Sequence, residues 1–151
     1  MVCRMFRLET EVDKARRDLL RTRLRETNST LSPVLRALRG TPAEEHRPLH
    51  VWIMDEDGTL AGGLVGYTWT AWLHVNLLWV DGRHRGRGLG SRLLTEAEHR
   101  AATERGCTAA RLETWDFQAP GFYTRQGYTV VCAIEDYPPG VTEYTLTKRL
   151  G

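Results

Sequence analysis

The stretch that decides the fold runs from residue 83 to residue 91 and reads Arg83-His84-Arg85-Gly86-Arg87-Gly88-Leu89-Gly90-Ser91. It follows an apolar segment of strand composition, and it opens a segment whose apolar residues recur at helical spacing: Leu89, Leu93, Leu94, Ala97 and Ala101. Glycines let a backbone approach a ligand closely, and the first N–H groups of a helix point outward without a partner. The sequence therefore predicts a site for a phosphorylated ligand at the start of this helix.

Two common phosphate-binding motifs do not match this stretch. A P-loop has Gly-Lys-Ser/Thr at the start of its helix, and no lysine stands here. A dinucleotide fingerprint requires G-x-G-x-x-G; Gly86 and Gly88 fit, but the third position is Ser91. The ligand site must therefore belong to another kind of loop.

The composition indicates one globular domain over residues 1–151. The chain has 41% hydrophobic and 26% charged residues and a formal net charge of +2, which excludes a disordered protein and argues against a nucleic-acid or membrane partner across the whole surface. Four arginines, Arg83, Arg85, Arg87 and Arg92, stand within ten residues that contain no acid. An RNA-binding arginine-glycine segment is an alternative, but these residues lack interleaved aromatic side chains.

An uncharged stretch, 58–80, is long enough to span a bilayer. Its glycines, its polar residues and its many Trp, Val and Thr residues instead predict two strands joined near 69–72. Three cysteines, Cys3, Cys107 and Cys132, form no C-x-x-C pair, so we expect no metal site and a reducing compartment, the cytoplasm, with Cys107 in the core.

The order of predicted elements indicates a mixed α/β sheet. The predicted strands cover 5–8, 49–54, 59–69, 74–80, 108–114, 128–134 and 142–150. The predicted helices begin near Val12, at Ser32-Pro33, at Leu89 and at Pro120, and glycines end the last three.

Two motifs carry a family resemblance. Residues 83–88 match [Q/R]-x-x-G-x-[G/A], and residues 119–128, Ala-Pro-Gly-Phe-Tyr-Thr-Arg-Gln-Gly-Tyr, match A-x-x-[LF]-Y-x-x-x-G-[FY]. Both resemble segments of the GNAT superfamily of N-acetyltransferases, and the order of elements is similar over nearly the whole chain. The resemblance implies an α/β fold with a central mixed sheet of six to seven strands, two of them splayed and parallel, and about four helices.

The resemblance also implies acetyl-CoA (coenzyme A) as the cofactor. Its pantetheine would lie against backbone groups of Leu78, Trp79 and Val80, and its pyrophosphate would lie on Arg85, Gly86, Arg87, Gly88, Leu89, Gly90 and Ser91. Where the family often has a cofactor-binding asparagine, this chain has Asp116, which accepts a hydrogen bond but cannot donate one; Gln118 is a possible substitute.

Catalytic roles follow from the same resemblance. Tyr123 aligns with the tyrosine that protonates the departing thiolate in this family. A phenol suits this role because it remains protonated at neutral pH. The first candidate for the base is His74, which simple alternation places on one strand face with Asn76 and Leu78. Glu113 is the second candidate, and many family members have no dedicated base.

The implied reaction is direct acetyl transfer to a primary amine of a small molecule such as a polyamine, an amine antibiotic or an amino-acid derivative. A protein or peptide acceptor and a non-catalytic acyl-CoA-binding module are the alternatives. Glu135 and Asp136 are either an acidic rim that favours a cationic acceptor or a solvated hairpin end. The oligomeric state stays open, with Trp72 and Trp115 as candidates for a homodimer interface or a pocket wall.

Overall fold

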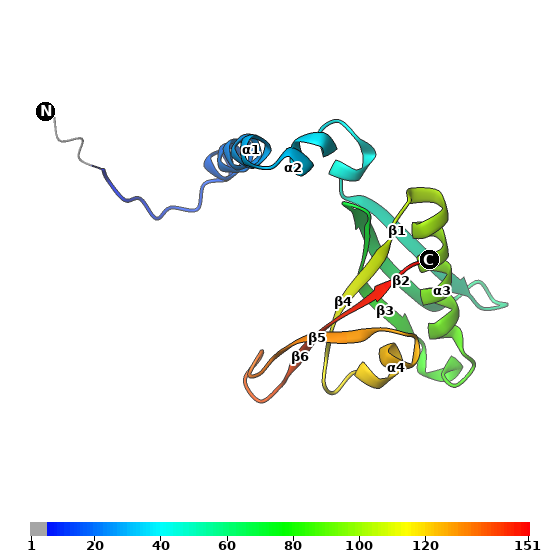
Figure 1. Ribbon diagram of the computed structural model, residues 1–151. Helices are drawn as coiled ribbons and strands as arrows, with labels where there is room; N and C mark the ends of the chain where they lie inside the picture. Colours follow the sequence, from blue (N-terminus) through cyan, green and yellow to red (C-terminus); the bar gives the residue numbers. More distant parts are fainter. Residues whose placement is uncertain (1–5) are drawn as a thin grey trace, which may run out of the picture. The chain divides into compact units, whose positions relative to one another are not determined.

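The computed structural model describes residues 6–151 (Figure 1). Its contacts divide the chain into two compact units, one ending at Arg39 and one beginning at Gly40. Each unit is described by itself.

The first unit contains α1 (Lys14–Leu31) and α2 (Pro33–Leu38). Asp13 caps α1, since its side chain accepts a hydrogen bond from the Arg16 N–H, and Ser32 caps α2 in the same way through the Leu35 N–H. Both predicted helices are confirmed, although Val12 precedes α1. The predicted strand at 5–8 is wrong for residues 6–8, which have no strand partner, and Met5 lies outside the described residues.

The second unit is a six-stranded sheet with the order β1-β2-β3-β4-β6-β5. Its strands are β1 (Arg47–Met54), β2 (Leu60–Trp69), β3 (Trp72–Val80), β4 (Ala109–Trp115), β5 (Thr129–Ile134) and β6 (Glu143–Arg149). Two α-helices, α3 (Leu89–Arg105) and α4 (Pro120–Arg125), and the short 3-10 helix η2 (Gly82–His84) lie between strands, and a second 3-10 helix, η1 (Pro42–Glu44), precedes β1. Only β3 and β4 pair in parallel, and the other pairs are antiparallel. The predicted mixed sheet is confirmed.

One face of the sheet packs against α3 (Figure 1). Four residues of the stripe predicted for this helix, Leu93, Leu94, Ala97 and Ala101, are buried as expected and at most 1% exposed, whereas Leu89 in the first turn is half-buried. Strand residues such as Leu64, Leu73 and Leu112 meet them in one core cluster, and Cys107 lies there too. The opposite face of the sheet, which carries Tyr67 and His74, is called the second face below.

The uncharged stretch 58–80 contributes β2 and β3, as predicted. These strands are joined by Thr70 and Ala71, which have φ values of 49° and 63°. Positive φ at both central residues gives the twist that a two-residue hairpin loop requires. No helix within the described residues is long and apolar enough to cross a membrane.

β3 and β4 separate halfway along their length. Their register pairs run from Trp72 with Ala109 to Val75 with Leu112 and end there, although both strands continue. At the same point β3 has a bulge, because Val75 pairs with Gly66 but Leu77 pairs with Val65. The bulge reverses the alternation: Leu78 and Val80 turn to the core while His74 stays on the second face. The expectation that His74 and Leu78 share a face is therefore wrong.

Candidate functional site

The loop before α3 presents an open backbone surface. Gly86 and Gly88 have φ values of 76° and 73°, and a Cβ built at either position would meet no atom within 4 Å. Gly88 is the N-cap of α3 and has no side chain to bind the first N–H groups of the helix. These donors are therefore available to an anion at the site that the sequence predicted.

The arginines of this loop have different surroundings. Arg83 is held by Asp81, with an Nη2–Oδ2 distance of 2.8 Å, and its hydrogen bonds lower the pKa of Asp81 to about 2. Within residues 6–151, no ion pair is formed by Arg85, Arg87 or Arg92. Three of the four arginines are thus free to face a negatively charged ligand.

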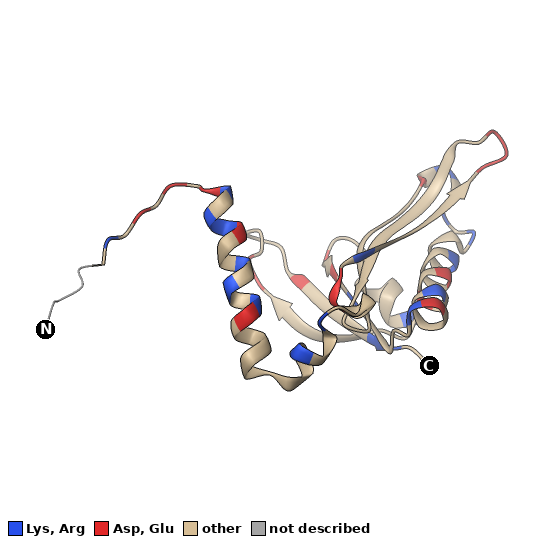
Figure 2. Ribbon diagram, turned by 90° about the horizontal axis from the view of Figure 1, so that it is seen from above, with Lys and Arg blue, Asp and Glu red and all other residues tan. Residues whose placement is uncertain are grey.

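A hollow of about 680 Å³ lies between this loop and the tip of the β1–β2 hairpin. The hairpin tip is acidic, Asp55-Glu56-Asp57, and is seen in red in Figure 2. The facing wall is basic and includes Arg87 and Arg92. His84 lies between the two walls, and its Nε2 is 3.9 Å from Asp55 Oδ2.

The second motif forms α4 and packs directly against the start of α3. A Cβ at Gly90 would lie 3.3 Å from the Phe122 ring, so the first turn of α3 fits closely onto this side chain. Gln126 Nε2 donates a hydrogen bond to Ser91 Oγ at 2.9 Å. The fold therefore joins two motifs that are about 30 residues apart in the sequence.

Tyr123 has a buried ring and a hydroxyl without a protein partner. The residue is 9% exposed, and its ring lies edge-on to Phe122 and Tyr128 with centroid distances of 5.0 and 6.0 Å. Among the described residues the hydroxyl has no hydrogen-bond partner, yet its oxygen is not one of the fully enclosed unpaired polar atoms. Burial raises the pKa of Tyr123, so the phenol holds its proton.

His74 lies on the second face, just before β3 and β4 separate. Its ring stacks on Tyr67 from β2, with centroids 4.7 Å apart and planes 14° apart, and the Tyr67 hydroxyl is 3.3 Å from His74 Nδ1. Burial and the Arg111 charge lower the pKa of His74 below its ordinary value of 6.5, so the neutral imidazole predominates at pH 7.

Glu113 lies on β4, on the same face, and its carboxylate forms an ion pair with Arg111. Arg111 is directly opposite His74 in the parallel register. Sequence reasoning missed Arg111 and Tyr67. A signal for Arg111 existed, because the alternation of β4 places Arg111 and Glu113 on one face, but nothing in the sequence pairs Arg111 with His74.

Asp116 caps the end of the β4–β6 pair. Its Oδ2 accepts a hydrogen bond from the Thr142 N–H at 3.1 Å, and its own N–H donates to the Thr142 carbonyl. Gln118 is engaged nearby, because its Oε1 accepts from Thr114 Oγ1 and from the Trp115 N–H. Both side chains therefore have structural partners.

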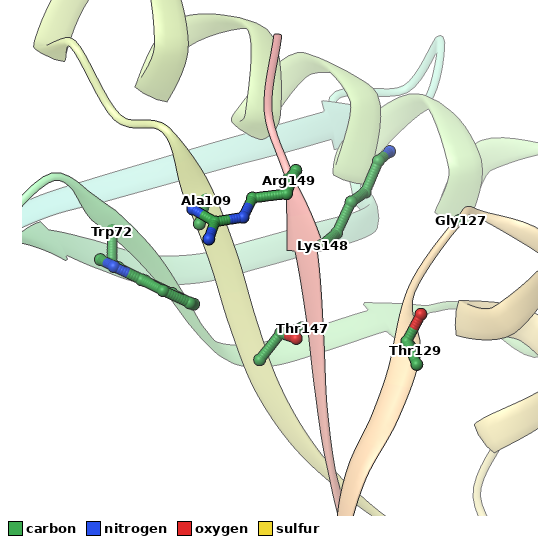
Figure 3. Close-up of a pocket in the computed structure, with 7 residues that line it drawn as sticks. All are labelled: Trp72, Ala109, Gly127, Thr129, Thr147, Lys148 and Arg149. Carbon is green, nitrogen blue, oxygen red and sulfur yellow. The ribbon is translucent and has the colours of Figure 1, made fainter.

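A second hollow, of about 460 Å³, is lined by the first residues of β3 and β4 and the last residues of β6 (Figure 3). Trp72 and Arg149 line it, and the Lys148 side chain points the other way, toward Glu98. Trp72 and Trp115, the two candidates for an interface or a pocket wall, are only partly exposed. Trp52 and Trp79 are more exposed, at 52% and 50%. No group of His, Cys, Asp or Glu side chains in residues 6–151 could hold a metal ion.

Comparisons with known proteins agree with this geometry. Residues 13–128 match the model of the Acetyltransferase (GNAT) family. The chain is 56% identical over 131 residues to a Blasticidin-S acetyltransferase of Streptomyces morookaense, covering 85% of this chain and 96% of that protein.

Two solved structures extend the comparison. The crystal structure of an acetyltransferase from Bacillus cereus has a TM-score of 0.81 and 28% identity, covering 95% of this chain and 98% of that one. The crystal structure of a nourseothricin acetyltransferase has a TM-score of 0.61 and 27% identity, covering 69% of this chain and 66% of that one. The mixed sheet with its parallel pair is therefore the architecture of these acetyltransferases.

Proposed function

Since the chain belongs to the acetyltransferase (GNAT) family and is an acyl-CoA N-acetyltransferase, we propose that it transfers the acetyl group of acetyl-CoA directly to a primary amine of a small molecule. Two similar proteins are named for antibiotics, blasticidin-S and nourseothricin, which favours an amine antibiotic over a polyamine or an amino-acid derivative. A protein or peptide amine is the second candidate. The family match includes residues from both compact units, which supports a single acetyltransferase domain over 1–151.

The observation that carries the proposal is the open backbone at the start of α3. Gly86 and Gly88 leave space where a Cβ would stand, and the N–H groups of the first turn have no cap. These groups, with Arg85 and Arg87 beside them, would hold the pyrophosphate of coenzyme A, and Leu89, Gly90 and Ser91 would complete the cradle. The residues present therefore fit the cofactor that GNAT acetyltransferases use.

The separation of β3 from β4 supplies the second part of the cofactor site. Beyond Val75, the edge of β3 has no strand partner on the side of β4 within the described chain. Backbone groups of Leu78, Trp79 and Val80 would bind the pantetheine amides along this edge, as an added strand would. Because Asp116 Oδ2 accepts a hydrogen bond from the Thr142 N–H, its other carboxylate oxygen would be available to accept one from an N–H group of the cofactor. The cofactor, when bound, supplies the acetyl group as a thioester.

Tyr123 is the proposed general acid. Its phenol holds a proton in a buried setting, and its hydroxyl has no competing partner in the described protein. It would donate this proton to the departing thiolate, which is a base of moderate strength. Phe122 and Tyr128 hold the ring in place from two sides.

His74 is the proposed base. An amine arrives as an ammonium ion and must lose a proton before it attacks the carbonyl carbon. Because Nδ1 of His74 faces the Tyr67 hydroxyl, Nε2 is the nitrogen that would take this proton. Glu113, already paired with Arg111, is the second candidate.

The transfer needs no enzyme-bound acetyl group. Cys107 is the buried thiol of the core, 4% exposed, and burial raises its pKa, so it stays a protonated thiol at neutral pH. Free thiols at Cys107 and Cys132 also suit a reducing compartment, the cytoplasm.

Release of free coenzyme A across a panel of amines tests the proposal. We expect turnover with at least one antibiotic or other small amine and none with peptides, and Tyr123→Phe should abolish most of it while acetyl-CoA still binds. Turnover with peptides alone would support the second candidate. Acetyl-CoA binding without turnover on any amine would contradict the proposed reaction and support a non-catalytic module.

A further inference from the structure

His74 is half-buried and has ring and charged side chains from three neighbouring segments beside it. Tyr67 stacks on it from β2, and His46, just before β1, stacks on Tyr67 with centroids 4.7 Å apart. Trp69 adds an edge contact to His46 at 5.0 Å, and its indole N–H donates to the Glu44 carbonyl. The imidazole is therefore fixed in a column of rings across the second face.

The charged neighbours of His74 come from β4. Arg111 is opposite His74 in the register of β3 and β4, and Glu113 follows two residues later on the same face. The guanidinium of Arg111 pairs with the Glu113 carboxylate, so the two charges offset each other beside the imidazole. Arg111 Nε is enclosed and has no hydrogen-bond partner in the described chain.

We infer that Arg111 and Tyr67 are positioning residues for the acetyl transfer: Arg111, opposite His74 in the strand register, engages the Glu113 carboxylate beside the imidazole, and Tyr67 fixes the plane of the imidazole. This inference rests on the proposed function, because it concerns the base of that reaction. The ion pair with Arg111 occupies the Glu113 carboxylate, which favours His74 over Glu113 as the base.

The charges around His74 determine in which direction its pKa moves when Arg111 is neutralised. Among residues 6–151, the titratable groups near His74 are His46, Tyr67, Arg111 and Glu113. Burial lowers the pKa of His74 most, followed by the Arg111 charge; Glu113 raises it, and His46 lowers it further. Neutralising Arg111 removes a lowering contribution and leaves Glu113 unopposed, so the pKa of His74 must rise.

Substitution Arg111→Gln tests this directly through the NMR titration of the His74 ring. We expect the titration midpoint of His74 to move to higher pH, and the acid limb of kcat/KM to move with it. The ratio of kcat/KM at pH 8 to that at pH 6 should rise several-fold. In the double variant Arg111→Gln/Glu113→Gln the midpoint should return toward the wild-type value.

Arg100→Gln is the matched control, since Arg100 forms a similar exposed Arg–Glu pair with Glu104 on α3, on the other side of the sheet. It should leave the His74 midpoint and the pH profile unchanged. An unchanged midpoint in Arg111→Gln, or an equal change in Arg100→Gln, would overturn the role of Arg111.

Tyr67 is tested with two variants. Tyr67→Phe keeps the stacked ring and should retain most of kcat, whereas Tyr67→Leu should lower kcat several-fold with little change in the KM for acetyl-CoA. Equal kcat values in Tyr67→Leu and wild type would overturn its role. If His74→Gln retains wild-type turnover while Arg111→Gln still moves the His74 midpoint, the proposed base is wrong and the electrostatic role of Arg111 stands, so the two failures are distinguishable.

Discussion

Gln126 Nε2 lies 2.9 Å from Ser91 Oγ, so a side chain at the end of α4 holds the first turn of α3. This hydrogen bond couples the motif that contains Tyr123 to the loop that contains Gly86 and Gly88. The proposed proton donor and the proposed phosphate cradle are thereby fixed relative to each other. The same contact offers a direct measurement of their coupling.

Removing either partner of this hydrogen bond should destabilise the protein modestly. A half-buried neutral hydrogen bond contributes about 0.5–1.5 kcal/mol to the free energy of unfolding. A double-mutant cycle of Gln126→Ala and Ser91→Ala in urea should therefore return a coupling energy of about 1 kcal/mol. Strictly additive effects would show that the two motifs are held together by packing alone.

An alanine at Gly86 should weaken coenzyme A binding more than it weakens the fold. Its positive φ strains any side chain by about 1–2 kcal/mol, and the loop would relieve the strain by moving the N–H groups that are proposed to bind the pyrophosphate. We expect the Kd for coenzyme A, measured by calorimetry, to rise at least about tenfold.

Gly58→Ala is the control for Gly86→Ala, because Gly58 has nearly the same φ, 75°, and equally open surroundings in the β1–β2 turn. It should cost similar stability and leave the Kd unchanged. A similar rise in Kd for both variants would mean that the loop holds no cofactor phosphate.

Tyr123→Phe should lower kcat by about 10²–10⁴-fold, the usual contribution of a positioned general acid. The Kd for acetyl-CoA should stay close to the wild-type value, since the ring and its packing remain. Because burial raises the pKa of Tyr123, no alkaline loss of activity from this group is expected below about pH 10. Tyr144→Phe, a partly buried tyrosine of the same core, should keep kcat, and a full-rate Tyr123→Phe enzyme would refute the assignment.

The stability of the fold should fall in strong base because of Tyr128. Its hydroxyl donates to Glu98 Oε1 at 2.9 Å, Lys148 donates to Glu98 Oε2 at 2.6 Å, and burial and the Glu98 charge raise the pKa of Tyr128 far above its usual value. A raised phenol pKa contributes stability below the unfolded-state value of about 10, and this contribution is lost as the pH rises above it.

We therefore expect the free energy of unfolding of the wild type to decrease above pH 10 by up to about 1.4 kcal/mol per pH unit for this tyrosine. Urea titrations between pH 8 and pH 11 measure the slope. Tyr128→Phe should be less stable at pH 8 and should show a shallower slope above pH 10. An identical slope would mean that other groups cause the alkaline loss.

Most of the local structure was predictable from the sequence, because its determinants are close together along the chain. The stripe from Leu89 to Ala101 predicted α3, and Gly106 ends that helix in a left-handed conformation. The loop that precedes α3 was predicted as a ligand site from its glycines and from its place at the start of a helix, and Gly86 and Gly88 have positive φ. The segment at 5–8 was mispredicted because short apolar runs do not distinguish a strand from an irregular segment.

The surroundings of His74, the proposed base, were not predictable. The bulge in β3 places Leu78 and His74 on opposite faces, against simple alternation, and bulges depend on the partner strand. Arg111 lies beside His74 only because β3 and β4 pair in parallel in one register. The sequence by itself determined the helices, the six strands of the sheet and the glycine-rich loop before α3 through local periodicity and glycine conformation. Only the tertiary structure decided which charges face His74, since that depends on strand order and register between segments far apart in the chain.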